Sequence, residues 1–134
     1  MRNLVKYCGS GVFAALLWAL TSVAVQAGTG VAVVVSPQQA ATLRSNQKAI
    51  IIDVREESEW QEQHIPGALH IPLGQLASRL GELDAYKHKP IIMQCRSGKR
   101  SAAAQASLKA AGFTEVYNME GGLMAWQAQG LATE

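Results

Sequence analysis

From residue 31 onward, short runs of apolar residues alternate along the chain with segments of mixed polarity. Continuous apolar runs of roughly four to eight residues are typical of strands that are buried on both faces, as in parallel sheets. Runs of this kind predict strands at 31–35, 49–54, 90–94 and 115–118, with a brief strand at 69–71. The pattern indicates a small, mainly parallel sheet.

The segments between these strands favour helices. Ser36 is a good N-cap residue and Pro37 is acceptable at the first helical position, so a helix is expected from there to about Asn46. Further helices are predicted at 73–83, where Leu73, Leu76, Leu80 and Leu83 recur at helical spacing, at 102–111, around Trp60 and around Trp126. Strands that alternate with helices predict an α/β fold with helices on both faces of the sheet.

The first 27 residues have the composition of a secretory signal peptide. Arg2 and Lys6 make its start basic, 12–20 is an uninterrupted apolar run, and Val25-Gln26-Ala27 places small residues where a signal peptidase cleaves. We expect cleavage before Gly28, export, and a periplasmic domain. The alternative is an uncleaved membrane anchor, which would also leave the domain outside the cytoplasm. Contact with a membrane is expected only in that alternative.

Residues 28–134 have the length of a single domain. The chain contains 12 Lys and Arg residues and 10 Asp and Glu residues, so loss of Arg2 and Lys6 would leave ten bases and ten acids. A formally neutral domain gives no reason to expect a nucleic acid partner. The chain has two cysteines, Cys8 and Cys95, and only Cys95 lies in the predicted domain. The cleaved protein could therefore form no internal disulfide.

Cys95 occupies the position where chemistry is most expected in such a fold. It follows the predicted strand 90–94 directly, and a short loop containing Gly98 leads from it into the next predicted helix. Ligands of open α/β sheets bind at the carboxyl ends of strands. Successive backbone N–H groups before a helix form an anion-binding concavity, which would favour the thiolate of Cys95. The competing interpretation is a small cysteine buried at the end of a strand.

The charges near Cys95 support a reactive thiolate. No acid lies between Ala85 and Thr114, while six bases do, and three of these are in the loop itself. A thiolate among N–H donors and cations is suited to attack on an anionic substrate. We therefore expect Cys95 to be the catalytic nucleophile. The predicted substrate-binding residues are those that follow it, namely Arg96, Ser97, Gly98, Lys99, Arg100 and Ser101.

Four motifs together resemble the single-domain rhodanese family. They are Ile52-Asp53-Val54-Arg55, His64-Ile65-Pro66-Gly67-Ala68 with His70-Ile71-Pro72, the loop from Cys95 to Ser101, and Glu120-Gly121-Gly122 with Trp126. The four motifs follow the order and spacing of the family, and the match spans about residues 31 to 130. One departure is Gln63, where the family usually has glycine, and we expect it to affect only a turn.

The resemblance implies a rhodanese-like α/β fold and thiosulfate sulfurtransferase activity. In such a reaction Cys95 would take the outer sulfur of thiosulfate as a persulfide and give it to cyanide or a thiol. The resemblance also leaves a protein open as the sulfur acceptor, and no cofactor is expected. No pair of histidines or carboxylates has the spacing of metal ligands, so no metal is implied either.

Two alternatives of other classes remain open at this point. The first is a phosphatase or arsenate reductase on the same fold, and the second is a non-catalytic carrier of sulfane sulfur for a protein partner. Cysteine phosphatases have an arginine six places after the cysteine, where this chain has Ser101. Arg100 comes one residue early, so the ring is smaller and the guanidinium is misplaced for phosphate. We therefore expect sulfur transfer rather than phosphate hydrolysis.

Three further polar residues are given supporting roles. Asp53 lies at the carboxyl end of its predicted strand, and we expect it and Arg55 to support the Cys95 loop rather than take part in the chemistry. His64 lies within a turn motif and is interpreted as a structural, hydrogen-bonding histidine.

Overall fold

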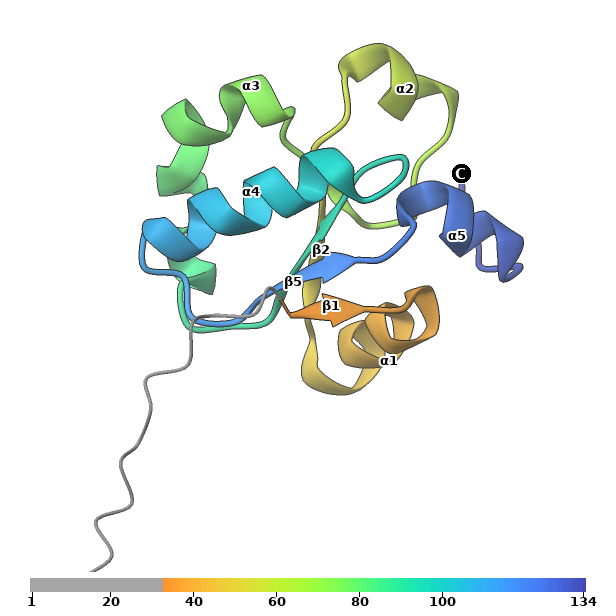
Figure 1. The fold of residues 1–134 in the computed structure, drawn as a ribbon, viewed down its shortest axis with the longest axis horizontal. Helices are drawn as coiled ribbons and strands as arrows, with labels where there is room; N and C mark the ends of the chain where they lie inside the picture. The colour runs from red at the N-terminus through yellow and green to blue at the C-terminus, as the bar shows by residue number, and fades with distance from the viewer. Residues whose placement is uncertain (1–32) are drawn as a thin grey trace, which may run out of the picture.

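The computed structural model describes residues 33–134 of the chain (Figure 1). The predicted signal peptide at 1–27, its alternative as a membrane anchor, and the first two residues of the strand predicted at 31–35 lie outside the described residues. Within the described residues, no helix combines the length and the apolar character that crossing a bilayer requires.

Five strands form one sheet in the order β1-β5-β4-β2-β3, and every neighbouring pair is parallel. Ile51 of β2 lies beside Ile92 of β4, and Asp53 lies beside Gln94. The carboxyl ends of these two central strands therefore finish side by side, and the predicted parallel sheet is confirmed. The strands are β1 (Val34–Val35), β2 (Ile50–Asp53), β3 (Leu69–His70), β4 (Ile91–Gln94) and β5 (Val116–Met119).

Helices cover both faces of the sheet, as predicted (Figure 1). One face packs against α1 (Pro37–Gln47) and α5 (Gly122–Ala128), with Ile51, Ile92 and Trp126 in the shared core. The other face packs against α3 (Leu73–Leu76), the 3₁₀ helix η1 (Ala77–Tyr86) and α4 (Lys99–Ala110), with Ile52, Met93 and Leu108 in the core. Successive strand residues therefore point into different cores, as the alternation of a strand requires.

The start of α1 follows its predicted capping chemistry. The Ser36 hydroxyl accepts a hydrogen bond from the Gln39 backbone N–H at 3.2 Å, and the Gln39 side chain accepts one from the Ser36 N–H at 2.8 Å. This reciprocal pair satisfies two backbone donors that a helix start otherwise leaves free.

The predicted helix 73–83 differs in detail from the structure. Only Leu73–Leu76 is α-helical, and the chain continues as a 3₁₀ helix from Ala77 to Tyr86. Leu76 and Leu83 are buried as expected. Spacings of three and four residues place leucines on one side of either type of helix, so the pattern predicts the buried side and not the hydrogen bonding.

The remaining helix, α2 (Glu57–Glu62), connects β2 to β3 and lies beyond the carboxyl ends of the strands. Pro66 and Gly67 make the predicted turn after it, because Gly67 has φ +72° and Ala68 N–H bonds to the carbonyl of Ile65 at 3.1 Å. The chain thus returns from α2 to the edge strand β3.

Candidate active site

Cys95 immediately follows β4 and only 1% of its surface is exposed. The next residues form a short loop, and α4 begins at Lys99, three residues earlier than predicted. Gly98 precedes the helix with φ +101°, a conformation in which a side chain would be strained. The predicted order of strand, cysteine, glycine-containing loop and helix is therefore confirmed.

Hydrogen-bond donors of the loop and of the start of α4 converge on the Cys95 sulfur. The Gly98 backbone N–H lies 3.1 Å from Sγ, and the Ser101 hydroxyl lies 3.4 Å from it. The backbone N–H groups of Ser97 and Ser101 also act on the thiolate. The sulfur is therefore surrounded by donors that stabilise a negative charge.

These donors determine the ionisation of Cys95. Burial alone would raise the pKa of the Cys95 thiol, because it disfavours the charged form. Hydrogen bonds from the Ser101 hydroxyl and from the N–H groups of Ser101, Gly98 and Ser97 outweigh burial and lower the pKa below its ordinary value. The lowered pKa agrees with the sequence prediction of a thiolate.

The N-terminal turn of α5 binds two carbonyls of the loop. The Leu123 N–H donates to the Cys95 carbonyl at 2.8 Å, and the Met124 N–H donates to the Arg96 carbonyl at 3.1 Å. Gly122 makes this approach possible, since a Cβ on it would lie 2.3 Å from the Cys95 carbonyl oxygen. Gly122 of the fourth motif therefore contacts the Cys95 loop directly.

Asn118 in β5 holds the other end of the loop. Its side-chain amide donates to the Gly98 carbonyl at 3.1 Å, and its Oδ1 accepts the Ser101 hydroxyl at 2.6 Å. The Gln94 side chain adds a bond of 2.7 Å to the Cys95 carbonyl. The N–H and C=O of one peptide point in opposite directions, so the Arg96 carbonyl, which is bound by Met124 N–H, leaves the Ser97 N–H of the same peptide directed at the sulfur.

Asp53 and Arg55 form a buried ion pair beside β4. Arg55 donates to both carboxylate oxygens, at 2.7 Å from its terminal nitrogen, and its exposed fraction is 4%. The same guanidinium donates to the carbonyls of Glu59 at 3.2 Å and Gln63 at 2.7 Å. The pair thereby fixes the middle and the C-terminal end of α2 to the sheet. The supporting role expected for Asp53 and Arg55 therefore runs through α2.

Arg100 is placed differently from the expectation that all three loop cations face the substrate. Its guanidinium makes two hydrogen bonds to Glu59 of α2, at 2.7 and 2.9 Å. These bonds to Arg100 lower the pKa of Glu59 to about 2, and they raise the pKa of Arg100. Arg96 and Lys99 are exposed and have no ion-pair partner within residues 33–134. These two cations are therefore the ones available to an anionic substrate.

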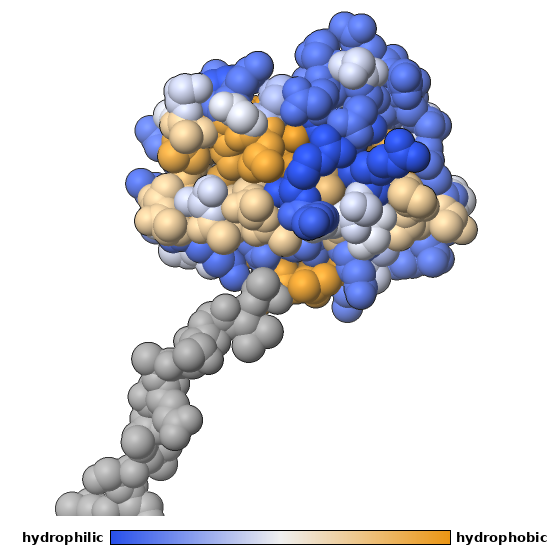
Figure 2. All heavy atoms as spheres, turned by 45° about the horizontal axis from the view of Figure 1, so that its top comes forward, coloured by the Kyte–Doolittle hydropathy of each residue, from blue (hydrophilic) through white to orange (hydrophobic). Residues whose placement is uncertain are grey.

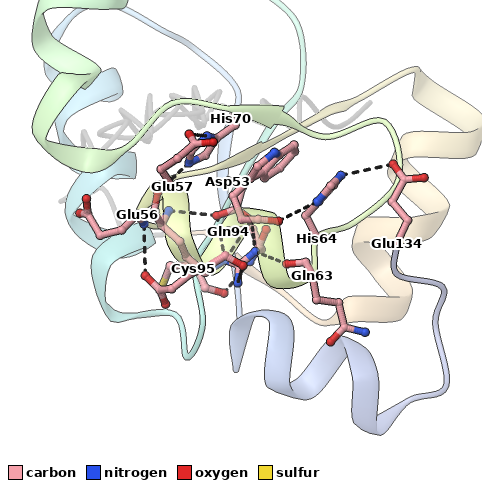
Figure 3. A network of polar contacts seen from close by, with 12 residues as sticks. Asp53, Glu56, Glu57, Gln63, His64, His70, Gln94, Cys95 and Glu134 are labelled. Carbon is pink, nitrogen blue, oxygen red and sulfur yellow. Dashed lines mark hydrogen bonds and ion pairs between the residues drawn. The ribbon is translucent and has the colours of Figure 1, made fainter.

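Trp60 of α2 stacks with two histidines, His64 and His70, which are labelled in Figure 3. The Trp60 ring lies against His64, with centroids 3.8 Å apart, and against His70 at 4.8 Å. His64 Nδ1 lies 2.8 Å from the Trp60 carbonyl, and His70 Nε2 lies 2.8 Å from the Arg55 carbonyl. These contacts agree with a structural role for His64.

A cleft of about 240 Å³ opens between α2 and α5, next to the Cys95 loop. The surface over α2 is hydrophilic, and the hydrophobic area lies beside it, over α3 and α4 (Figure 2). One wall comes from α2, the other from α5, and Arg96 joins them from the loop. The lining residues are Arg55, Glu59, Glu62, Gln63, Arg96, Leu123, Met124 and Gln127.

Sequence reasoning missed Asn118, Glu59 and Gln63 as parts of the site. Asn118 gives a detectable signal, because it is a polar residue near the carboxyl end of an apolar strand. Glu59 gives none, since its partner Arg100 lies 41 positions away. Gln63 does more than affect a turn, because its side chain accepts a hydrogen bond from Gln127 and donates one to Thr133.

Comparisons with known proteins agree with this fold and site. The chain matches the Rhodanese-like domain family over residues 36–129. It is 35% identical over 94 residues to thiosulfate sulfurtransferase GlpE of Pseudomonas savastanoi pv. phaseolicola, covering 70% of this chain and 86% of GlpE. It is 40% identical to the putative sulfur carrier protein YrkF of Bacillus subtilis, covering 61% of this chain but only 43% of YrkF.

Among solved structures, the chain resembles the rhodanese-like domain of the Alr3790 protein from Anabaena sp. The two share 28% identity with a TM-score of 0.69, over 75% of this chain and 77% of that domain.

Proposed function

The chain belongs to the rhodanese-like domain family, and on that basis we propose that it is a sulfurtransferase that carries the outer sulfur of thiosulfate as a persulfide on Cys95. One observation carries the proposal, namely the ring of N–H donors and the Ser101 hydroxyl directed at the Cys95 sulfur. The likeness to the thiosulfate sulfurtransferase GlpE supports thiosulfate as the donor.

In the first half-reaction the Cys95 thiolate attacks the outer sulfur of thiosulfate. A new S–S bond forms, the bond from that sulfur to the sulfonate breaks, and its electron pair leaves with sulfite. The charge is conserved, since one thiolate and one dianion become one persulfide anion and one dianion. Sulfite is stable as a free anion, so no general acid is needed. Arg96 and Lys99 would hold the sulfonate end, because their charges are exposed beside the loop.

The persulfide anion then remains in the ring of donors until an acceptor arrives. Its terminal sulfur would take over the hydrogen bonds that stabilise the thiolate of the free enzyme. A nucleophile such as cyanide or a thiol removes the outer sulfur and returns the electron pair to Cys95. The ring thus serves both forms of the enzyme.

Phosphate or arsenate chemistry is the weaker alternative. A tetrahedral oxyanion would need a free guanidinium at the end of the loop, whereas the Arg100 guanidinium is bonded to Glu59. The next position is Ser101, whose hydroxyl is shared between Cys95 and Asn118. Both features favour a single sulfur atom at this position.

A non-catalytic sulfur carrier is the second alternative, and the name of YrkF motivates it. A carrier would form the same persulfide on Cys95 but would not turn over with a small acceptor. Repeated turnover with thiosulfate and cyanide separates the two functions.

Mass spectrometry of the purified protein tests the proposal. After treatment with thiosulfate, the protein should gain about 32 Da, the mass of one sulfur atom, and cyanide should remove it with formation of thiocyanate. The Cys95→Ser variant should gain nothing, because only a thiolate can carry the sulfur. No adduct on the unaltered protein, or clear hydrolysis of an aryl phosphate, would reject the assignment.

We also propose that the domain is exported after cleavage following Ala27, on the basis of the basic start, the apolar run and Val25-Gln26-Ala27. The intact mass of the protein recovered from its native host shows directly whether residues 1–27 have been removed. An intact N-terminus in a membrane fraction would reject cleavage and favour the anchor.

A further inference from the structure

The cleft between α2 and α5 has a composition that the transfer of sulfur from thiosulfate does not explain. We infer that it binds the sulfur acceptor and that this acceptor is a small zwitterionic thiol, with an ammonium group and a carboxylate as in an amino acid or a short peptide. The inference rests on the proposed function, because it concerns the second half-reaction at Cys95. It adds the chemical class of the acceptor and the residues that select it.

The charges of the cleft provide the first argument. Four charged residues line it, and two of them are already paired, Arg55 with Asp53 and Glu59 with Arg100. The other two, Glu62 and Arg96, have no ion-pair partner within the part of the chain that the structure describes. Glu62 lies on the α2 wall and Arg96 on the loop. One free negative charge and one free positive charge complement a ligand that carries both signs.

The size of the cleft provides the second argument. Its volume of about 240 Å³ is below the range of about 300–1,000 Å³ that is usual for drug-sized ligands. The volume excludes neither cyanide nor a thiol, but cyanide would leave both free charges and the apolar wall unused. Leu123 and Met124 form that wall, and Met124 is 55% exposed. A short carbon chain between charged groups fits such a lining.

Gln63 limits how large the acceptor can be. Its Oε1 accepts a hydrogen bond from Gln127 of α5, so the two side chains connect the walls of the cleft. The backbone carbonyl of Gln63 is meanwhile fixed by Arg55 at 2.7 Å. Rhodanese-like domains usually have glycine at this position, and glycine could not form this bridge. The bridge is therefore a feature of this chain that favours a compact acceptor.

Arg96 can serve both half-reactions in turn. It would hold the sulfonate of thiosulfate first, and sulfite then leaves the site. The carboxylate of the acceptor takes its place, while the ammonium group faces Glu62. The acceptor thiolate attacks the outer sulfur, one S–S bond forms, and the bond to Cys95 breaks with its electron pair returning to the Cys95 thiolate. The products are a small persulfide and the free enzyme, so electrons and atoms balance.

The test separates loading from discharge. The full protein is loaded with thiosulfate, freed of donor, and checked for the added sulfur by mass. Its discharge is then followed in a single turnover with cysteine, with 3-mercaptopropionate, which lacks the ammonium group, and with cysteamine, which lacks the carboxylate. Rates are compared at equal thiolate concentration and are divided by the rate of each thiolate with a small disulfide in solution, because thiolates of higher pKa are intrinsically more nucleophilic; cyanide provides the reference. Cysteine should be faster than either analogue by about threefold to fivefold, the size expected of one partly exposed charge pair.

Two variants assign the effect to named residues. Glu62→Gln should make cysteine and 3-mercaptopropionate nearly equal, whereas Glu115→Gln, an exposed change before β5 and away from the cleft, should keep the difference. Gln63→Gly should reduce the preference for cysteine over the larger thiol glutathione. Retention of cysteine's advantage in Glu62→Gln would overturn the inference, as would equal rates in the unaltered protein.

The outcome also separates this inference from the proposed function. A protein that loads normally but discharges equally with all three thiols would retain the proposed function and lose the inference. A protein that cannot be loaded would lose both.

Discussion

The Cys95 loop and helix α2 lie against each other and are stabilised by different kinds of interaction. The loop is held almost entirely by neutral hydrogen bonds, from backbone N–H groups of α5 and from the amides of Asn118 and Gln94. Helix α2 is held by charged side chains, because Arg55 binds the carbonyls of Glu59 and Gln63 and because Glu59 pairs with Arg100. The Glu59–Arg100 pair connects the two regions.

This difference indicates which residues perform the chemistry. Charged residues near a reactive cysteine invite the interpretation that they bind the substrate or activate the sulfur. Here Arg55 and Arg100 are engaged in holding α2, while the hydrogen bonds that lower the pKa of Cys95 come from Ser101 and from backbone N–H groups. The reactivity of Cys95 therefore depends on the geometry of the loop, and stability depends on the charges of α2.

The largest effect is expected from Asp53→Ala, on stability. The variant leaves the Arg55 charge buried without its partner, which typically costs about 3–5 kcal/mol. Chemical denaturation should show a loss of this size. Glu82→Gln removes the carboxylate of an exposed ion pair with Arg79 and should leave the denaturation midpoint almost unchanged. Equal effects of the two changes would contradict the role given to the buried pair.

The next largest effect is expected from Gly122→Ala, on activity. Its Cβ would lie 2.3 Å from the Cys95 carbonyl oxygen, so the loop must shift. A misplacement of about 1 Å can cost about a hundredfold in rate. Gly130→Ala is a matched control, because Gly130 has a similar positive φ of 71° but no atom within 4 Å of the added Cβ. Normal sulfur transfer by Gly122→Ala would contradict the clamp formed by α5.

Local patterns predicted much of this arrangement. The apolar run before Cys95, the glycine at 98 and the alanine-rich segment after it are neighbours in sequence, so their order of strand, loop and helix could be predicted. The contacts of Asn118 with Gly98 and of Glu59 with Arg100 join residues 20 and 41 positions apart. Such contacts depend on the order of strands in the sheet and on where α2 packs. The pattern of a single segment predicts neither the strand order nor the packing of α2.

Gln63 is a second case in which a local pattern does not predict a contact between distant segments. The sequence shows that Gln63 replaces the family's usual glycine before a turn. Its backbone φ of −168° is extended, a conformation that any residue can adopt. Its consequence comes from the side chain, which reaches Gln127 of α5. The predicted turn is thus correct at 65–68, whereas the contact between α2 and α5 could not be predicted from the turn.

A smaller effect is expected from Ser101→Ala. Removal of the hydroxyl takes away one of the hydrogen bonds that lower the pKa of Cys95, so this pKa should rise. The higher pKa would reduce the fraction of Cys95 that is thiolate, and with it the alkylation rate near neutral pH. Ser107→Ala lies on the exposed side of the same helix and should change neither quantity. An unchanged rate in Ser101→Ala would assign thiolate stabilisation to the backbone alone.

The smallest effect is expected from Glu59→Gln, in acid. Folding lowers the pKa of Glu59 from 4.5 to about 2, so the ionised carboxylate stabilises the native state above about pH 4.5. This contribution is lost as the pH falls from about 4.5 through 2. The pair is partly exposed, so about 1 kcal/mol or less is expected. Urea midpoints at pH 5 and pH 2.5 should show a steeper acid loss for the unaltered protein than for the variant, and parallel losses would contradict the pair's contribution.

The central claim is that the donors around the sulfur, and not the exposed cations, make Cys95 a thiolate. The rate of Cys95 alkylation as a function of pH measures this most directly, in the unaltered protein and in a variant with Arg96→Gln and Lys99→Gln. The account predicts an apparent pKa below the ordinary cysteine value of about 8.5 in both proteins. A value at or above 8.5 in the unaltered protein, or one that returns to 8.5 when the two cations are removed, would contradict it.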